Sequence, residues 1–561
     1  MSVIYFYFFI FFLVFSYFFI TISIFLVNYD CFLLDLFFHP LGFTEVSLCF
    51  CFDHVSLFFF SVVSLISSVV FFYRKFYMRI NLDKNYINSR FLSVLFLFVI
   101  SIFFLVFSYS WASLILGWDG LGIVSFLLVV FYSDSVSLNS GLITVFTNRL
   151  GDCLFIIRFI RMSVRGLLRF GFLTLYSSLF FCILLCIGAI TKSAQAPFSS
   201  WLPAAIAAPT PVSSLVHSST LVTAGVFVIL RFGFLFKDVF FIISFISLFT
   251  IFIAGLCRIL EFDFKKVVAI STLRQLGFII FSVSLGLRCY CFLHIIFHAF
   301  FKRMLFLSTG SLMHLLRGDQ DYRNFGSLRD SFFSKCFFNC RCLSLIGAPF
   351  TLGFYRKDFI LSRYFFENTS LFFIVFFISC CFTVSYSFRL IMISSFLFPS
   401  FFTSLSFIES KSFFFPVFIL FVFCTFVGNF FIAYFFPVVF LSFFDLFTGL
   451  VAIISGMRLF FLFDTFYSLK IYLSGISFMS YIFSSGISSK FSKFSFFLDT
   501  LWLEKFGGKG SMELLSSVRF FIVPMFSVYF WVMPISFFII IFFFVLFVDS
   551  YRALALKGLR D

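Results

Sequence analysis

The chain has 561 residues, of which 62% are hydrophobic and only 11% are charged, and its mean hydropathy is +1.14. A soluble domain carries roughly twice that charged fraction, so the composition excludes a soluble protein. The net charge is +16, and we assign the basic residues to short loops scattered along the chain. This distribution is typical of a membrane protein, whereas a nucleic-acid-binding protein would gather them on one face. Those basic residues include Arg74, Lys75, Arg79, Lys265, Lys266, Lys302 and Arg303.

Apolar runs long enough to cross a hydrocarbon layer of ~30 Å recur along the chain and predict a helical polytopic membrane protein, because continuous apolar runs do not fit barrel strands. We expect about 14–17 helices from this pattern. The candidate spans are residues 3–27, 45–72, 91–108, 110–131, 141–160, 172–199, 202–230, 236–257, 266–287, 289–310, 338–354, 359–399, 413–440, 443–465, 470–486 and 519–548.

Phenylalanine supplies 112 residues, although leucine would fill lipid-facing positions equally well. Because phenylalanine codons are rich in T, this bias indicates a T-rich organellar gene. Residues 1–27 look like a first span, and no amphipathic transit peptide precedes them. We expect an organelle-encoded, multi-pass protein.

The pattern divides the chain into four regions. Residues 1–90 are expected to form N-terminal spans, residues 91–400 the functional core, and residues 401–483 further spans. Residues 484–561 mix charged and apolar residues before a last apolar run, which predicts an interfacial segment followed by an anchor helix; a plain loop is the competing interpretation.

The stretch TKSAQAPFSSWLPAAIAAPTPVSSLVH, residues 191–217, places Lys192 and His217 in apolar sequence. Three helix breakers lie between them: Pro203, Pro209 and Pro211. A second interrupted stretch, GAPFTLGFYRKDFI, contains Pro349, Lys357 and Asp358. Paired interrupted segments in a transporter indicate a site near the middle of the membrane, where a wet cavity satisfies the freed backbone groups.

Charged residues within the predicted spans are costly, at least ~2.5–3.5 kcal/mol each, and so indicate function or a partner. Asp119 lies in GWDGLG, and TNRLGDC brings Arg149 and Asp152 together near an expected helix start. The alternative for Arg149 and Asp152 is an ion pair that only fixes two helices.

The motif HIIFHAFFKRMLF spaces His294, His298 and Lys302 at i, i+4 and i+8, which puts them on one face of a helix. Each histidine alone would more often be an ordinary core residue. Lys302 precedes Arg303, so the alternative for this lysine is a positive helix end. Together they form a polar track of groups that can carry protons, because histidine titrates near neutral pH and lysine does so once desolvated.

Metal and redox sites are not expected. Cys336, Cys340 and Cys342 form the only dense cysteine cluster, and its spacing matches no iron–sulfur motif. The sequence contains no dinucleotide-binding fingerprint, so we expect this chain to bind no cofactor itself.

Six motifs together resemble the antiporter-like membrane subunits of respiratory complex I, specifically chain 5 of NADH:ubiquinone oxidoreductase. They are GWDGLG, NRLGD, the lysine–proline–histidine stretch extended to TAGV, FKKVVAISTLRQLG, HAFFKRMLFLSTGS and GFYRKD, within residues 45–360. The tail WLEKFGGKG resembles the region that joins this family's lateral helix to its last span.

The resemblance implies 15–16 transmembrane helices, two inverted five-helix repeats, and a lateral helix with a C-terminal anchor. It implies proton translocation in the mitochondrial inner membrane, with NADH, FMN, iron–sulfur clusters and ubiquinone used elsewhere in the complex. Partners would be the neighbouring antiporter-like subunit, subunits under the lateral helix, and lipids. The residues that match the family's proton path are Asp119, Lys192, His217, His294, His298, Lys302, Lys357 and Asp358.

The sequence departs from the family at several positions. Asp119 replaces a longer glutamate, so its contact with Lys192 is expected to need water or a helix shift. Arg274, Arg356 and Asp319 stand where uncharged or histidine residues are expected. Two alternatives therefore remain: a stand-alone multisubunit sodium/proton antiporter subunit, and a structural scaffold whose pump is degenerate.

Overall fold

The computed structural model describes residues 2–28, 31–37, 47–77, 85–164, 179–218, 220–316, 318–327, 332–348, 351, 353, 370–396, 411–427 and 443–465. All of them belong to one compact unit, Met1–Ser480, and the second unit, Tyr481–Asp561, lies outside the described residues. The expected spans 470–486 and 519–548 and the interfacial segment therefore fall outside them as well.

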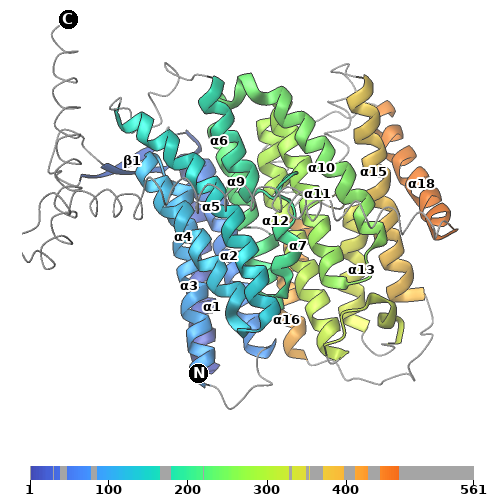
Figure 1. Cartoon of the computed structure of the whole chain (residues 1–561). Helices are drawn as coiled ribbons and strands as arrows, with labels where there is room; N and C mark the ends of the chain where they lie inside the picture. The colour runs from blue at the N-terminus through green and yellow to red at the C-terminus, as the bar shows by residue number, and fades with distance from the viewer. Residues whose placement is uncertain are drawn as a thin grey trace, which may run out of the picture. The chain divides into compact units, whose positions relative to one another are not determined.

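The described part is a bundle of long helices (Figure 1) with one short hairpin. The N-terminal elements are α1 (Ser2–Phe25), the antiparallel strands β1 (Phe32–Phe37) and β2 (Ser47–Phe52), α2 (His54–Tyr77), α3 (Asn85–Phe107), α4 (Trp111–Val129) and α5 (Ser135–Val164). The expected span 45–72 is thus wrong at its start, because its residues Ser47–Phe52 pair with β1 in the register Phe32↔Phe52 before helix α2 begins.

The central elements surround an interrupted segment. They are α6 (Leu179–Lys192), α7 (Trp201–Ala204), α8 (Thr210–Val212), the π-helical turn η5 (Ser213–His217), α9 (Leu221–Arg231), α10 (Phe240–Leu260), α11 (Phe264–Ser284) and α12 (Arg288–Leu315). The later elements are α13 (Phe332–Ile346), α15 (Ser370–Ile391), α16 (Lys411–Val422) and α18 (Phe443–Thr465). Nine helical segments of the described residues are long and apolar enough to cross a membrane.

Serine and threonine side chains inside these apolar helices are satisfied locally. In α2, the hydroxyls of Ser61, Ser64 and Ser67 each donate to the carbonyl three residues earlier, at 2.6–2.8 Å. Hydrocarbon offers no water to such groups, so bonding back to the helix removes their desolvation cost. These serines are therefore compatible with a spanning helix and need no functional role.

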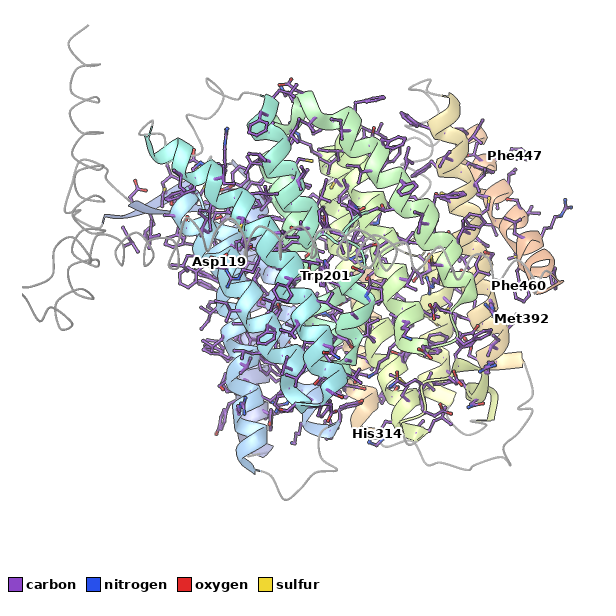
Figure 2. All side chains as sticks on the ribbon, viewed as in Figure 1. Asp119, Trp201, His314, Met392, Phe447 and Phe460 are labelled. Carbon is purple, nitrogen blue, oxygen red and sulfur yellow. The ribbon has the colours of Figure 1, made fainter. Side chains whose placement is uncertain are left out.

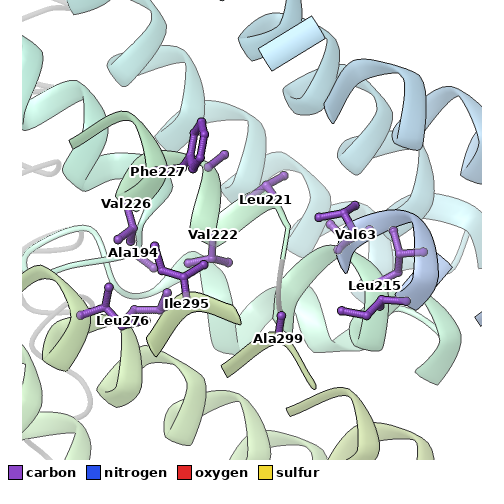
Figure 3. Packing of buried hydrophobic residues seen from close by; sticks show 14 of the residues in the cluster. Val63, Ala194, Leu215, Leu221, Val222, Val226, Phe227, Leu276, Ile295 and Ala299 are labelled. Carbon is purple, nitrogen blue, oxygen red and sulfur yellow. The ribbon is translucent and has the colours of Figure 1, made fainter. Parts of the chain in front are cut away.

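A buried apolar core joins the N-terminal helices to the central ones. Figure 3 shows part of it, which includes Val63 of α2, Val222 of α9 and Ile295 of α12 as well as Leu215 of the interrupted segment. Glycines allow the helices around α6 to approach closely: a Cβ added to Gly225 of α9 would lie 2.5 Å from the carbonyl oxygen of Ala189 in α6. Small residues at helix contacts are the usual device for close packing in membranes.

The α3–α4 contact depends on Gly117, and this generates a stability prediction. A Cβ added there would lie 2.5 Å from the backbone nitrogen of Leu105, whereas one added to Gly122 on the same helix would meet nothing within 4 Å. We expect Gly117→Ala to lower the free energy of unfolding by about 1–3 kcal/mol through overpacking. Gly122→Ala, the control, should be neutral or stabilising because alanine favours helix. Thermal unfolding of the purified protein in detergent measures both, and equal midpoints would contradict the packing argument.

Candidate functional site

The ammonium group of Lys192, the last residue of α6, is fully buried. Its Nζ donates to the backbone carbonyl of Trp118 in α4 at 2.5 Å and lies 3.8 Å from the centroid of the Trp118 ring. The carbonyl dipole and the negative face of the ring both favour a positive charge at this position. Trp118 is thus the residue in direct contact with Lys192, and sequence reasoning missed it because it focused on the neighbouring carboxylate.

The carboxylate of Asp152 in α5 connects Trp118 to Arg149. Trp118 Nε1 donates to Asp152 Oδ1 at 2.9 Å, and Asp152 Oδ2 lies 3.4 Å from Arg149 Nη1. Arg149 Nη1 also lies 4.0 Å from Asp119 Oδ2. The carboxylates of Asp152 and Asp119 both lie within electrostatic range of Lys192.

These four charged groups form a gradient from the core to the surface of the described bundle, where Figure 2 labels Asp119. Lys192 is fully buried, the Asp152 side chain is 5% exposed, that of Asp119 is 30% exposed and that of Arg149 is 50% exposed. Neither carboxylate is within ion-pair distance of Lys192. The expectation that Asp119 and Lys192 need water or a helix shift to touch agrees with this separation.

The expectation that Arg149 and Asp152 lie near a helix start is wrong. Both lie in the middle of α5, a helix of 30 residues. Helix α5 begins at Ser135, well before the polar run in TNRLGDC, and Gly151 of that run packs against Thr191 of α6. The same packing places α5 against the end of α6 that carries Lys192.

The segment after Lys192 leaves helical geometry and its backbone groups find side-chain partners. The indole nitrogen of Trp201, labelled in Figure 2, donates to the carbonyl of Thr191 at 3.0 Å. Gln195 donates to the carbonyl of Ser193 at 3.0 Å and accepts from Thr250 of α10 at 2.6 Å. These bonds replace the lost helical ones in a place where an unpaired carbonyl is costly.

The three prolines lie where the helical segments are short. Pro203 is inside the four-residue α7, Pro209 directly precedes α8, and Pro211 is inside α8. The predicted span 202–230 is therefore not one continuous helix. Of the remaining predicted site residues, His217 ends the turn η5 with its side chain outside the described ones, and Pro349, Lys357 and Asp358 lie outside the described residues.

Helix α12 carries the predicted polar track in its buried interior. His294, His298 and Lys302 are each at most 1% exposed, and Lys302 Nζ donates to the hydroxyl of Ser271 in α11. The ring of His298 meets Phe301 edge to face, with centroids 5.5 Å apart.

The assignment of Lys302 and Arg303 to a short loop is wrong, because both lie in the middle of the 28-residue α12 and are fully buried. Arg303 donates to the carbonyl of Leu215 at 3.0 Å and to the hydroxyl of Ser218 at 3.3 Å. Arg303 therefore joins α12 to the interrupted segment. The sequence signal for its burial is the presence of two adjacent basic residues within a long apolar run. Arg74, also assigned to a loop, is buried in the last turn of α2 over the Phe91 ring.

The cysteine cluster has no common environment: Cys336 is exposed, Cys340 is intermediate and Cys342 is buried. Within the described ranges, no group of three or more histidine, cysteine, aspartate or glutamate residues is placed to hold a metal ion.

An interrupted segment beside a buried lysine, in a bundle of spanning helices, is an arrangement found in membrane transporters, and the comparisons with known proteins give the class as that of antiporter-like membrane proteins. The family described as "NADH:quinone oxidoreductase/Mrp antiporter, TM" matches residues 108–383. Two solved structures share the fold. The Mrp complex from Dietzia sp. has a TM-score of 0.68 at 19% identity over 95% of this chain and 59% of that one. The archaeal membrane-bound sulfane sulfur reductase has a TM-score of 0.63 at 16% identity over 80% of this chain and 92% of that one.

Relatives named NADH-ubiquinone oxidoreductase chain 5 narrow the assignment. The protein of Anopheles quadrimaculatus is 42% identical over 62% of each chain, and that of Anopheles arabiensis is 43% identical over 56% of this chain and 84% of its own length. The Caenorhabditis elegans protein is 42% identical over 64% of this chain and 67% of its own. The chain belongs to the NADH-ubiquinone oxidoreductase chain 5 family, and its match spans about 62% of the length of the first of these relatives.

The contact between Trp118 and Asp152 generates a prediction about stability. Trp118→Phe keeps a ring over Lys192 but removes the donor to a charged acceptor, so we expect a loss of about 1.5–3 kcal/mol in the free energy of unfolding. The control Trp201→Phe removes an equally buried donor to a neutral carbonyl, and should cost about 0.5–1.5 kcal/mol. Thermal unfolding in detergent compares the two variants; a smaller loss for Trp118→Phe would mean that Asp152 does not accept this bond as an anion.

Proposed function

We propose that this chain is a proton-translocating subunit in the membrane arm of respiratory complex I of the mitochondrial inner membrane. The observation that carries the proposal is the fully buried Lys192, which ends α6 at a helix break and is flanked by the carboxylates of Asp152 and Asp119. An ammonium group is costly away from water, so its protonation state depends on where those carboxylates lie.

The mechanism is electrostatic and has two states. With Asp152 and Asp119 close, the positive charge on Lys192 is stabilised and the lysine keeps its proton. When Asp119 moves outward with Arg149, that stabilisation weakens and Lys192 releases its proton toward the interrupted segment. The contact of Asp119 with the half-exposed Arg149, and not with Lys192, supports an outward position for Asp119.

The onward route runs from Lys192 through His217, His294, His298 and Lys302 toward Lys357 and Asp358. Two contacts support its central part. Arg303 holds α12 against the residues around His217, and Ser271 offers a hydroxyl to Lys302 in a region closed to bulk solvent. Hydroxyl and imidazole groups linked by water can pass protons along such a line.

The outward face of α5 supports a membrane partner. Phe146 is 66% exposed and Leu150 is 57% exposed, on either side of the half-exposed Arg149. Asp152 and Asp119 supply counter-charges to Arg149, but its half-exposed guanidinium group is still costly at a lipid-facing surface unless a polar surface covers it. We propose that a neighbouring antiporter-like subunit covers this face and that lipids cover the remaining apolar surface.

In this proposal the chain contributes proton transfer to an NADH:ubiquinone reductase and holds no redox centre. NADH, FMN, iron–sulfur clusters and ubiquinone would be handled by other subunits. A stand-alone sodium/proton antiporter subunit is the alternative that the Mrp-like fold favours. Co-purification in mild detergent separates the two, because only the complex I subunit should bring flavin-containing and iron–sulfur subunits with it.

Replacement of the buried lysine tests the proposal directly. We expect Lys192→Met to abolish NADH-driven proton pumping by the reconstituted complex while assembly is retained, because the change removes a costly charge without removing volume from the core. The control is Lys237→Met, at an exposed lysine of the turn Gly233–Val239, which should pump normally. Normal pumping by an assembled Lys192→Met complex would refute the mechanism, and loss of pumping in both variants would show a nonspecific effect.

The role of Asp119 generates a second functional prediction. If charge matters more than reach, Asp119→Asn should reduce pumping more strongly than Asp119→Glu, since glutamate keeps the negative charge beside Arg149. The ratio of protons moved to NADH oxidised measures both variants at equal amounts of assembled complex. Wild-type ratios for Asp119→Asn would remove this residue from the mechanism.

A further inference from the structure

A cluster of hydroxyl groups lies near the end of the bundle at which α2 and α12 both end. Tyr73 is near the end of α2, and its hydroxyl donates to the carbonyl of Leu307 in α12 at 3.2 Å. The hydroxyls of Tyr73 and Tyr77 both approach the hydroxyl of Thr210, the first residue of α8. Tyr73 and Thr210 are fully buried. The cluster therefore joins two continuous helices to the interrupted segment.

Gly310 of α12 leaves room between these hydroxyls. A Cβ added to Gly310 would lie 2.6 Å from the hydroxyl oxygen of Tyr73 and 3.1 Å from that of Thr210. Within the described residues, the Thr210 hydroxyl forms no hydrogen bond of ordinary length, although two tyrosine hydroxyls approach it. A buried hydroxyl without a partner is costly, and water often bridges polar groups that are too far apart for a direct bond. The cluster therefore has the composition of a water-binding site.

Toward the end of the bundle, the cluster is continued by a histidine. Tyr77 is the last residue of α2 and is partly exposed, and its ring centroid lies 6.1 Å from that of His314. His314 is in the last turn of α12, is also partly exposed, and is labelled in Figure 2. Exposure thus falls from Tyr77 and His314 to Tyr73 and Thr210. Because histidine titrates near neutral pH, His314 can exchange protons at this end.

Toward the interior, the cluster is continued by the interrupted segment. Ser214, which is fully buried, lies about one turn beyond Thr210, and His217 lies about two turns beyond it. On α12, Gly310 follows Lys302 at a distance of about 12 Å along the helix axis. The hydroxyl cluster therefore lies between the partly exposed His314 and the level of His217 and Lys302, which belong to the proposed proton path.

We propose that the hydroxyls of Tyr73, Tyr77 and Thr210, bridged by water, form a proton access site that connects the α2 and α12 end of the bundle to the interrupted segment. This inference rests on the proposed proton path and names the place where protons join it. Each oxygen in the site accepts one hydrogen and releases the one that it held, so the transfer needs no other reactant and leaves every hydroxyl neutral.

The test removes the Thr210 hydroxyl while it keeps the volume of the side chain. We expect Thr210→Val to slow NADH-driven pumping by the assembled, reconstituted complex by a factor on the order of 100, the contribution of one positioned proton-transfer group. Thr210→Ser keeps the hydroxyl and should retain pumping. The matched control is Thr309→Val in α12, which should pump normally. Thr309 is 1% exposed, and its hydroxyl donates to the carbonyl of Phe306 in its own helix at 2.9 Å.

The outcomes separate the access site from the proposed function. Loss of pumping in Thr210→Val alone, with normal pumping in Thr210→Ser and Thr309→Val, supports the access site. Normal pumping by assembled Thr210→Val, while Lys192→Met blocks pumping, overturns the access site and leaves the proposed function intact. Equal loss in Thr210→Ser and Thr210→Val also overturns it, because the position would then matter for packing and not for its hydroxyl.

A second variant covers the case in which Thr210→Val does not assemble. Tyr77→Phe removes a hydroxyl at the partly exposed side of the cluster and keeps the ring, so it should slow pumping in the same way. Normal pumping by the assembled Tyr77→Phe complex would overturn the access site. Normal pumping by Lys192→Met would instead refute the proposed function itself.

Discussion

One constraint organises the helices around the end of α6: the ammonium group of Lys192 is buried there, and it must be stabilised without water. Placing an ammonium group at bilayer depth costs at least ~2.5–3.5 kcal/mol on insertion scales, so the surrounding helices must supply what water would have given. The carbonyl and ring of Trp118 do so by contact, and Asp152 does so at longer range. Because these groups come from α4 and α5, both helices must lie against α6.

Close helix packing and the helix break serve the same purpose. Gly151 and Gly225 let α5 and α9 approach α6 where a side chain would collide with its backbone or with Thr191. The break after Lys192 then exposes carbonyls, and Trp201 and Gln195 satisfy the groups around it. Helix packing, hydrogen bonding of the freed backbone and stabilisation of the buried charge therefore all take place at the end of α6.

The sequence by itself determined the class of protein, the approximate place of many of the described spans and the interrupted segment, since apolar length and residue spacing are local properties. The motifs, taken together, also determined the family. It also placed His294, His298 and Lys302 on one helix face, because the helical period alone decides this. Only the tertiary structure decided that Trp118 contacts Lys192, that Asp119 contacts Arg149 instead, and that Arg303 is buried against Leu215. Those contacts join helices that are distant in the chain. Which charge contacts which partner depends on packing differences of one helical turn or a few ångströms, and no local sequence pattern encodes such differences.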